Sequence, residues 1–178
     1  MFEEIDFGDD FYNPKYVGIV LDVSDKILEK VKQEIIPALK SFDSNDVVYI
    51  YHPLFEELPD KIGKTIGMLG RYQRPLDFDP GEAVADTIYL FCEQDLYADK
   101  TIFIITDNYQ FKSFNNLLKS FKIDKRYNFD FQFHIIGIGD KSREMANIYN
   151  ENVLCTFKLF DTEIGIADYL RETSNGTD

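Results

Sequence analysis

Four short apolar segments alternate with amphipathic segments along the chain, and this alternation limits the folds that the sequence can adopt. The apolar segments are residues 16–23, 47–51, 101–106 and 131–139. Each is nearly continuous, which is typical of strands covered on both faces. Between them, apolar residues recur at helical spacing in residues 25–41, 80–92 and 111–121. The sequence therefore predicts a three-layer α/β/α fold, with a mostly parallel, Rossmann-like sheet flanked by helices.

The other segments complete one predicted domain. Residues 153–160 are a further strand candidate, and a last helix is expected near 162–172. Segment 53–76 contains three glycines in its middle and little periodicity, so we interpret it as an irregular connection with at most one short edge strand. We therefore expect an acidic N-terminal arm, a single domain and a flexible tail, over residues 1–15, 16–172 and 173–178.

The charge of the chain excludes two classes of partner. Its 178 residues include 32 acidic and 19 basic side chains, for a net charge of −13. A phosphate backbone is bound by a basic surface, and an anionic membrane attracts basic segments for the same reason. Moreover, no apolar run approaches the roughly 18 residues of a spanning helix. We therefore expect neither nucleic acid nor a membrane as a partner.

Cysteine content and the first residues indicate a cytoplasmic protein. Cys92 and Cys155 are too few for a disulfide framework. The opening sequence MFEEIDFGDD has neither the basic region nor the apolar stretch of a secretory signal. The abundance of Asn, Lys, Ile, Phe and Tyr is typical of an AT-rich genome, such as that of a phage.

Acidic and hydroxyl side chains gather where the predicted strands end. They are Asp22, Ser24, Asp107 and Asp140, together with Asp77 and Asp79 before the 80–92 helix. In an open parallel sheet, ligands bind outside the carboxyl ends of the strands. Clustered carboxylate and hydroxyl oxygens at such an edge are the ligands that a hard cation such as Mg²⁺ uses.

Simpler structural roles compete at these positions. The stretch DPGE (79–82) has the pattern of a helix start, with Asp79 as N-cap and proline at the first helical position. Ser24 or Asp25 would equally cap the 25–41 helix, and Asp107 with Asn108 would begin a loop. Helix capping alone explains less well than a cation site does why several of these residues fall at one edge of the sheet.

Patterns for other chemistries are incomplete. The stretch IGKT (62–65) ends like a phosphate-binding loop, but position 58, where that loop needs glycine, is Leu58. No Gly-x-Ser-x-Gly elbow is present, and neither His52 nor His134 has a nucleophile nearby in the sequence. The cysteines lack zinc-ligand spacing. Asp22 also stands without the second acidic residue that a phosphate-accepting receiver needs at its first strand.

The order of the motifs resembles the von Willebrand factor A (vWA) family. The matching stretches are IVLDVSDK, FDPGEAV, IFIITDN and FHIIGIGD, followed by EMANIY and the closing helix. The family has Asp-x-Ser-x-Ser after its first strand, a threonine before a glycine-containing helix start, and an aspartate after a later strand. The resemblance spans about residues 16–172. It implies a vWA-like fold with a metal-ion-dependent adhesion site at the carboxyl edge of the sheet.

The same resemblance implies that this adhesion site is degenerate. Three ligand positions of the family are retained, namely Asp22, Ser24 and Asp107. The second serine is Lys26, and Phe78 stands at the threonine, with Asp77 and Asp79 on either side as candidate replacements. We predict that the Lys26 ammonium takes the place of the metal and lies within salt-bridge reach of Asp22 or Asp107.

The resemblance implies a binding module rather than an enzyme. Our first hypothesis is a non-catalytic intracellular interaction or scaffold domain that needs no cofactor. Its protein partner would be an AAA+ ATPase or a multi-subunit complex. The alternative is a Mg²⁺-dependent binder that captures an acidic group of a partner, and an enzyme using the acidic cluster comes third. The candidate partner-binding residues are Asp25, Arg71, Arg74, Asn108 and Asp140.

Overall fold

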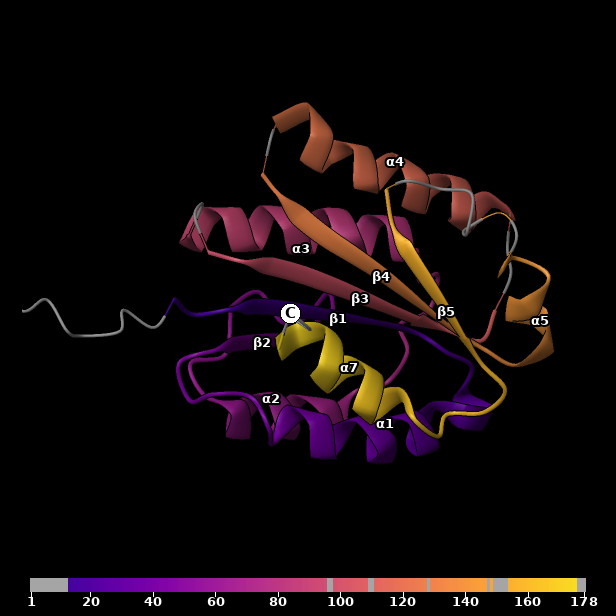
Figure 1. Ribbon diagram of the computed structural model, residues 1–178, viewed down its shortest axis with the longest axis horizontal. Coiled ribbons are helices and arrows are strands. Elements are labelled where there is room, and N and C mark those ends of the chain that lie inside the picture. The colour runs from indigo at the N-terminus through magenta and orange to yellow at the C-terminus, as the bar shows by residue number, and fades with distance from the viewer. Residues whose placement is uncertain are drawn as a thin grey trace, which may run out of the picture.

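The fold is built on five parallel strands. The computed structural model describes residues 13–95, 98–108, 111–127, 129–146, 148 and 154–175. Its strands are β1 (Tyr16–Asp22), β2 (Val47–Ile50), β3 (Lys100–Thr106), β4 (Phe131–Ile138) and β5 (Thr156–Phe160). They pair in the order β2-β1-β3-β4-β5, and every pairing is parallel (Figure 1). This is one of the common strand orders of doubly wound sheets.

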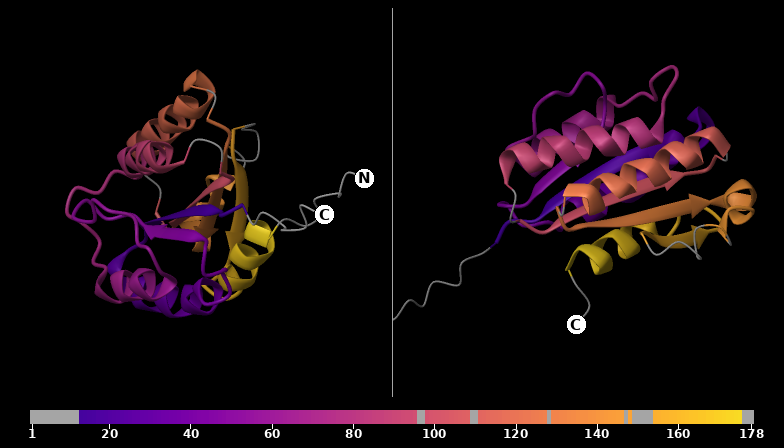
Figure 2. Two further views of the ribbon diagram at one scale, coloured as in Figure 1. Left: turned by 90° about the vertical axis from the view of Figure 1, so that its left-hand side faces the viewer. Right: turned by 90° about the horizontal axis from the view of Figure 1, so that it is seen from above.

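Helices cover both faces of the sheet, as the sequence predicts (Figure 2). One face is covered by α1 (Asp25–Leu39), α2 (Ile62–Arg71) and α7 (Ile166–Asn175). The other is covered by α3 (Pro80–Gln94) and α4 (Phe111–Tyr127). The short helix α5 (Gly139–Arg143) lies beside β4 and β5. The predicted three-layer α/β/α, Rossmann-like fold is confirmed.

The strand interiors form the core between the helix layers. One apolar residue from each of four strands is at most 1% exposed: Val20, Ile50, Ile104 and Ile136. Successive side chains of a strand point to opposite faces of the sheet. Ile19 and Leu21 therefore pack on the α1 side, while Val20 packs on the α3 side. Burial on both faces explains why these strands read as continuous apolar runs.

Segment 53–76 contains the helix α2, and the predicted irregular connection with a short edge strand is wrong for this part of it. The helix buries Thr65, Met68 and Leu69. The Thr65 hydroxyl donates a 2.6 Å hydrogen bond to the carbonyl of Val48 in β2. The three glycines of α2 are all exposed. Since each glycine costs a helix about 1 kcal/mol relative to alanine, packing against the sheet stabilises α2 more than local propensity does.

The first and last described segments lie together. Lys15 Nζ donates a 2.8 Å hydrogen bond to the carbonyl of Ser174, and the Lys15 amide donates to Asp46 Oδ1 at 3.0 Å. Helix α7 continues to Asn175, so it extends into the segment predicted as a flexible tail. Residues 1–12 of the predicted arm and residues 176–178 of the tail lie outside the described residues. Within the described ranges, no helix combines the length and apolarity needed to cross a bilayer.

His134, in β4, is expected to make stability depend on pH. Its ring stacks on Phe103 at 5.2 Å between ring centres, and its Nδ1 lies 3.3 Å from the Tyr169 hydroxyl. Burial lowers the pKa of His134. The folded state therefore disfavours the imidazolium, and stability should fall as pH drops through the ordinary histidine pKa of about 6.5.

Thermal unfolding of wild type and His134→Gln at about pH 7.5 and about pH 5.5 measures this effect. We expect the decrease in Tm on acidification to be smaller in the variant. His52→Gln measures the part that comes from the only other histidine of the chain. An equal decrease in wild type and His134→Gln would contradict the prediction.

Candidate functional site

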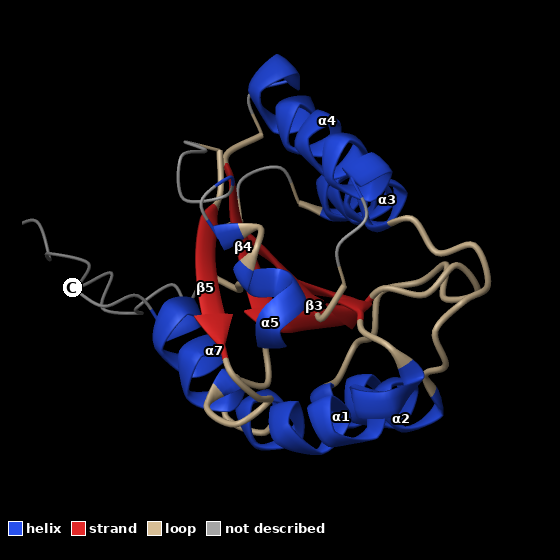
Figure 3. Cartoon of the chain, turned by 90° about the vertical axis from the view of Figure 1, so that its right-hand side faces the viewer, coloured by secondary structure: helices blue, strands red, loops and turns tan. Residues whose placement is uncertain are grey.

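Asp22 and Thr106 end two neighbouring strands at the carboxyl edge of the sheet. They are opposite each other in the β1–β3 pairing. The chain passes from β1 through α1 to β2 on one side and later returns to β3 on the other, so the strand order reverses between β1 and β3. Figure 3 looks onto this edge. Such a switch point is where open α/β sheets bind their ligands.

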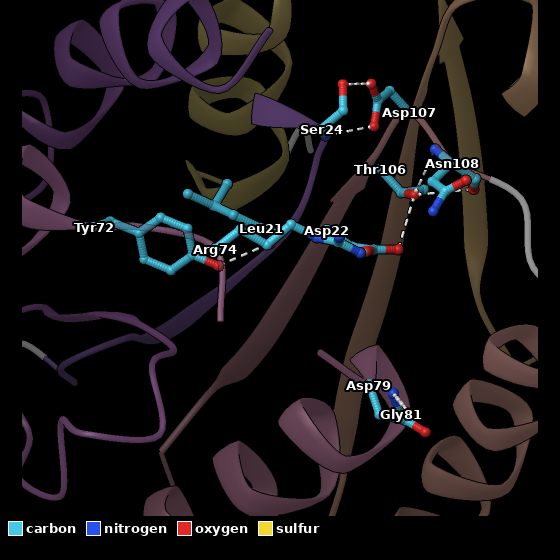
Figure 4. A network of polar contacts seen from close by, with 10 residues as sticks. All are labelled: Leu21, Asp22, Ser24, Tyr72, Arg74, Asp79, Gly81, Thr106, Asp107 and Asn108. Carbon is cyan, nitrogen blue, oxygen red and sulfur yellow. Dashed lines mark hydrogen bonds and ion pairs between the residues drawn. The ribbon is translucent and has the colours of Figure 1, made fainter. Parts of the chain in front are cut away.

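Asp22 is a buried carboxylate bound by a guanidinium. The residue is 7% exposed. Its Oδ1 accepts a 2.8 Å hydrogen bond from Arg74 Nη2, and its Oδ2 accepts a 3.1 Å bond from Thr106 Oγ1 (Figure 4). Burial raises the pKa of Asp22, whereas the contacts with Arg74 and Thr106 act in the opposite direction. The ion pair thus offsets part of the cost of burying this carboxylate.

The segment that follows α2 carries Arg74 to the edge. Tyr72 is 1% exposed, and its hydroxyl donates a 2.9 Å hydrogen bond to the carbonyl of Leu21 in β1. Two residues further on, the Arg74 guanidinium carbon lies 5.7 Å from the ring centre of Phe78. An anchored tyrosine and a cation–π contact therefore position the guanidinium beside Asp22.

Ser24 and Asp107 form a second polar pair, between the start of α1 and the end of β3. The Ser24 hydroxyl donates a 2.5 Å hydrogen bond to Asp107 Oδ2, and the Ser24 amide donates a 2.8 Å bond to Asp107 Oδ1 (Figure 4). Ser24 is the N-cap residue of α1, but its side chain makes no capping hydrogen bond. The hydroxyl instead joins two loops across the edge, and the carboxylate lies where the helix dipole favours negative charge.

Thr106 connects the loop after β3 to the neighbouring helix. Its hydroxyl oxygen accepts a 3.1 Å hydrogen bond from the Asn108 amide, and the Asn108 carbonyl oxygen lies 3.1 Å away as a second acceptor, beside Asp22, for the single hydroxyl proton. Its carbonyl accepts a 3.1 Å hydrogen bond from the hydroxyl of Ser142, which is fully buried in α5. Asn108 therefore belongs to a turn closed by Thr106, in agreement with its interpretation as a loop start.

Lys26 does not reach the site, so the prediction that its ammonium replaces the metal is wrong. Lys26 is exposed in the first turn of α1. The cation that contacts Asp22 is Arg74. A lysine in the first turn of a helix is disfavoured by the helix dipole, and here its side chain is directed to solvent. The predicted type of contact is present, but another residue supplies it.

Asp79 and Asp77 lie apart from the Asp22 pair. Asp79 Oδ1 accepts hydrogen bonds from the amides of Gly81 at 2.8 Å and Glu82 at 3.3 Å, and Oδ2 accepts a 2.5 Å bond from Asn116 Nδ2. This confirms Asp79 as the N-cap of α3, and Figure 4 shows it separated from Asp22. Asp77 is exposed, with a left-handed backbone at φ 56°. Neither residue takes the place of the family's threonine beside Asp22.

The other candidate residues are distributed over the same side of the molecule. Asp25 is exposed in the first turn of α1, and Arg71 is exposed in the last turn of α2. Asp140 is exposed in α5, with Oδ1 3.7 Å from Arg143 Nε. These charged groups are exposed and therefore accessible to a partner, whereas Arg74 is half-buried against Asp22.

The side-chain oxygen atoms that the vWA resemblance assigns to a metal form hydrogen bonds and an ion pair with other residues of the protein instead. Asp22 is bound by Arg74, while Ser24 and Asp107 bind each other. Within the part of the chain that the structure describes, no group of three or more His, Cys, Asp or Glu side chains is placed to hold a metal ion. The arrangement joins β1, β3 and α1 into one fixed edge.

Sequence reasoning missed Thr106 and gave Arg74 a different role, as a candidate partner-binding residue. Thr106 is the last residue of an apolar strand and directly precedes Asp107. This position at a strand end is the sequence signal that could have identified it as a residue of the edge. Arg74 belongs to a segment with four basic residues, at 61–74, but spacing alone does not indicate which of these side chains reaches Asp22.

Comparison with known proteins adds no family to this description. No family model matches the chain, and no curated protein has a significantly similar sequence. Fold and site together define a doubly wound α/β domain whose switch point is closed by its own ion pair and hydrogen bonds.

Proposed function

We propose that this chain is a non-catalytic protein-interaction module, similar to vWA domains, that binds its partner without a metal. The observation that carries the proposal is the Arg74–Asp22 ion pair at the switch point. A divalent cation bound to Asp22 would lie beside a guanidinium, and like charges at that separation repel strongly in a partly buried site. Metal binding would also break the Ser24–Asp107 hydrogen bonds.

The exposed charges around the edge support a role in binding a protein. Asp25, Arg71 and Asp140 are exposed on three different helices. Exposed charges of both signs on a rigid scaffold are suited to fixing the register of a protein partner and to steering its approach. We propose an AAA+ ATPase or a multi-subunit complex as the partner, on the basis of the vWA resemblance. A cytoplasmic location is part of the same proposal, and both cysteines are free thiols.

A Mg²⁺ titration tests the metal-independent part of the proposal. We expect calorimetry of the wild type to show no saturable heat, and Tm to stay constant as Mg²⁺ is raised, because a ligand that binds only the folded state would raise it. Arg74→Ala frees the Asp22 carboxylate, so it is the variant in which weak binding should first become measurable. Saturable binding to the wild type that is lost in Asp107→Ala would favour the Mg²⁺-dependent binder instead.

Charge reversal at the edge tests the interaction itself. A partner captured from the native host is purified, and its affinity is measured for wild type, Asp25→Lys/Asp140→Lys and the control Asp99→Lys. Asp99 is exposed at the opposite edge, before β3. We expect the double variant to bind about tenfold more weakly and the control to bind as wild type does. Equal affinities for all three proteins, at equal Tm, would overturn the proposed surface.

A further inference from the structure

A cleft with an aromatic wall lies next to the carboxyl edge, outside the Asp22 pair. It has a volume of about 420 Å³ and is bounded by three segments: the end of β2 with the following loop, the loop at 75–79, and the first turns of α3. Clefts of this size, with apolar walls and a few polar groups, are the usual binding sites of proteins. Residue types in the cleft then decide which ligand chemistry it accepts.

Aromatic rings form the inner wall of the cleft, where Tyr49 is 2% and Tyr51 is 8% exposed. Tyr49 and Tyr51 meet edge to face at 6.5 Å between ring centres, and Tyr51 lies 6.3 Å from Phe78. The Tyr49 hydroxyl donates to the carbonyl of Phe55 at 2.8 Å, and the Tyr51 hydroxyl donates to Asp86 Oδ2 at 3.0 Å. These bonds fix the rings in place. Phe78 already contacts one guanidinium, that of Arg74.

Carboxylates surround the aromatic wall without basic partners. The acidic lining residues are Glu56, Asp77, Asp79, Glu82 and Asp86. Among the described residues, none of the five forms an ion pair, and the only titratable base in the lining is His52, whose pKa is lowered by burial. Burial and the nearby Asp86 and Glu82 carboxylates raise the pKa of Tyr51. The lining therefore has five acidic side chains and neither lysine nor arginine, and the nearby Arg74 guanidinium is paired with Asp22.

Two exposed leucines extend the apolar surface beyond the cleft. Leu76 lines it and is 94% exposed, and Leu54, in the loop after β2, is 79% exposed. Large side chains this open to water gain most from being covered by a partner. A segment with several apolar residues would cover more of this surface than a single amino acid would.

We propose that this cleft binds an arginine or lysine side chain from a basic, leucine-containing segment of the partner protein. A cation beside carboxylates that have no basic partner gains electrostatically, and its aliphatic stem gains from contact with the apolar surface of the cleft. The inference rests on the proposed interaction role and names the chemistry of the partner. The chain's own residues 1–12 are a poor occupant, because they carry five acidic and no basic side chains. Nucleic acid is excluded from the cleft by the same charge argument.

A tryptophan-labelled peptide tests the proposal, because the protein contains no tryptophan. The probe is a short peptide with arginine flanked by leucines and one tryptophan, and its fluorescence is titrated with the full chain. We expect saturable binding that weakens with salt and is about tenfold weaker for Glu56→Gln/Glu82→Gln. The control is Glu93→Gln, an exposed glutamate in the last turn of α3. Leu76→Ser should also weaken binding.

Other outcomes would overturn the inference. A peptide with glutamate in place of arginine should not bind, and equal binding of both peptides would show a merely apolar contact. Equal affinity for free arginine amide would indicate a small-molecule site rather than a docking surface. If no peptide bound, while the charge-reversal variants still weakened binding of the native partner, this inference would be refuted and the proposed function would stand. If no variant weakened the binding of either the peptide or the native partner, both this inference and the proposed function would be refuted.

Discussion

Phe91→Ala is expected to lower the free energy of unfolding by about 3–5 kcal/mol, the range for removing a buried aromatic side chain. Phe91 is fully buried on α3. Its ring meets Tyr16 of β1 at 5.4 Å, Tyr49 of β2 at 6.3 Å and Phe131 of β4 at 6.4 Å between centres. One side chain thus joins α3 to three strands, and truncation leaves a cavity that those strands cannot easily close.

Urea unfolding of wild type, Phe91→Ala and Phe91→Leu measures this effect. Leucine refills part of the volume but loses the edge-to-face and stacked contacts, so its cost should be clearly smaller. The matched control is Tyr89→Ala on the same helix, since Tyr89 is 47% exposed. A loss in Phe91→Ala no larger than that in Tyr89→Ala would contradict the assigned packing of α3 on the sheet.

Arg74→Ala is expected to destabilise the protein by about 2–4 kcal/mol, because it leaves a buried carboxylate without its cation. We place the value below the upper limit for buried pairs since the Arg74 side chain is 28% exposed. The neighbouring Arg71 is exposed, and Arg71→Ala should change stability by no more than about 0.5 kcal/mol. Asp22→Asn in the Arg74→Ala background should restore part of the loss.

The penalty of Arg74→Ala should also depend on pH. Burial already raises the pKa of Asp22, and Arg74 opposes that rise, so the variant raises it further. An acid whose pKa is raised on folding contributes stability at low pH that is lost as pH rises through the folded-state value. The difference between wild type and variant should therefore be larger at about pH 7 than at about pH 4. A difference independent of pH would mean that Asp22 is not the group left unpaired.

Periodicity predicted most of the fold, and it failed where packing overrides local preference. The central strands and α3 bury long apolar patterns, and their types followed from the sequence alone. Helix α2 was missed because it is short, contains three glycines and buries only Thr65, Met68 and Leu69. Its stability comes from contacts with β2 that are remote in the sequence, such as the bond from Thr65 to Val48.

The polar edge was predictable only in part, for a related reason. Strand ends place Asp22, Ser24 and Asp107 at one edge, because parallel strands all end on the same side. The partner of Asp22 depends on where a loop returns after α2, and Arg74 is 52 residues further along the chain. Lys26 is the basic residue nearest to Asp22 in the sequence. Its position on helix α1 fixes the direction of its side chain, however, and this side chain is exposed to solvent.

The contact between Lys15 and Ser174 determines where a tether or a second protein domain can be joined to this domain. These residues are 159 positions apart, yet a single 2.8 Å hydrogen bond joins them. They lie where β1 begins and α7 ends, on the side away from Asp22 (Figure 1). A tether, a fused domain or the new loop of a circular permutant placed there would span only a short gap. Such attachments would leave the Asp22 edge and the aromatic cleft unobstructed.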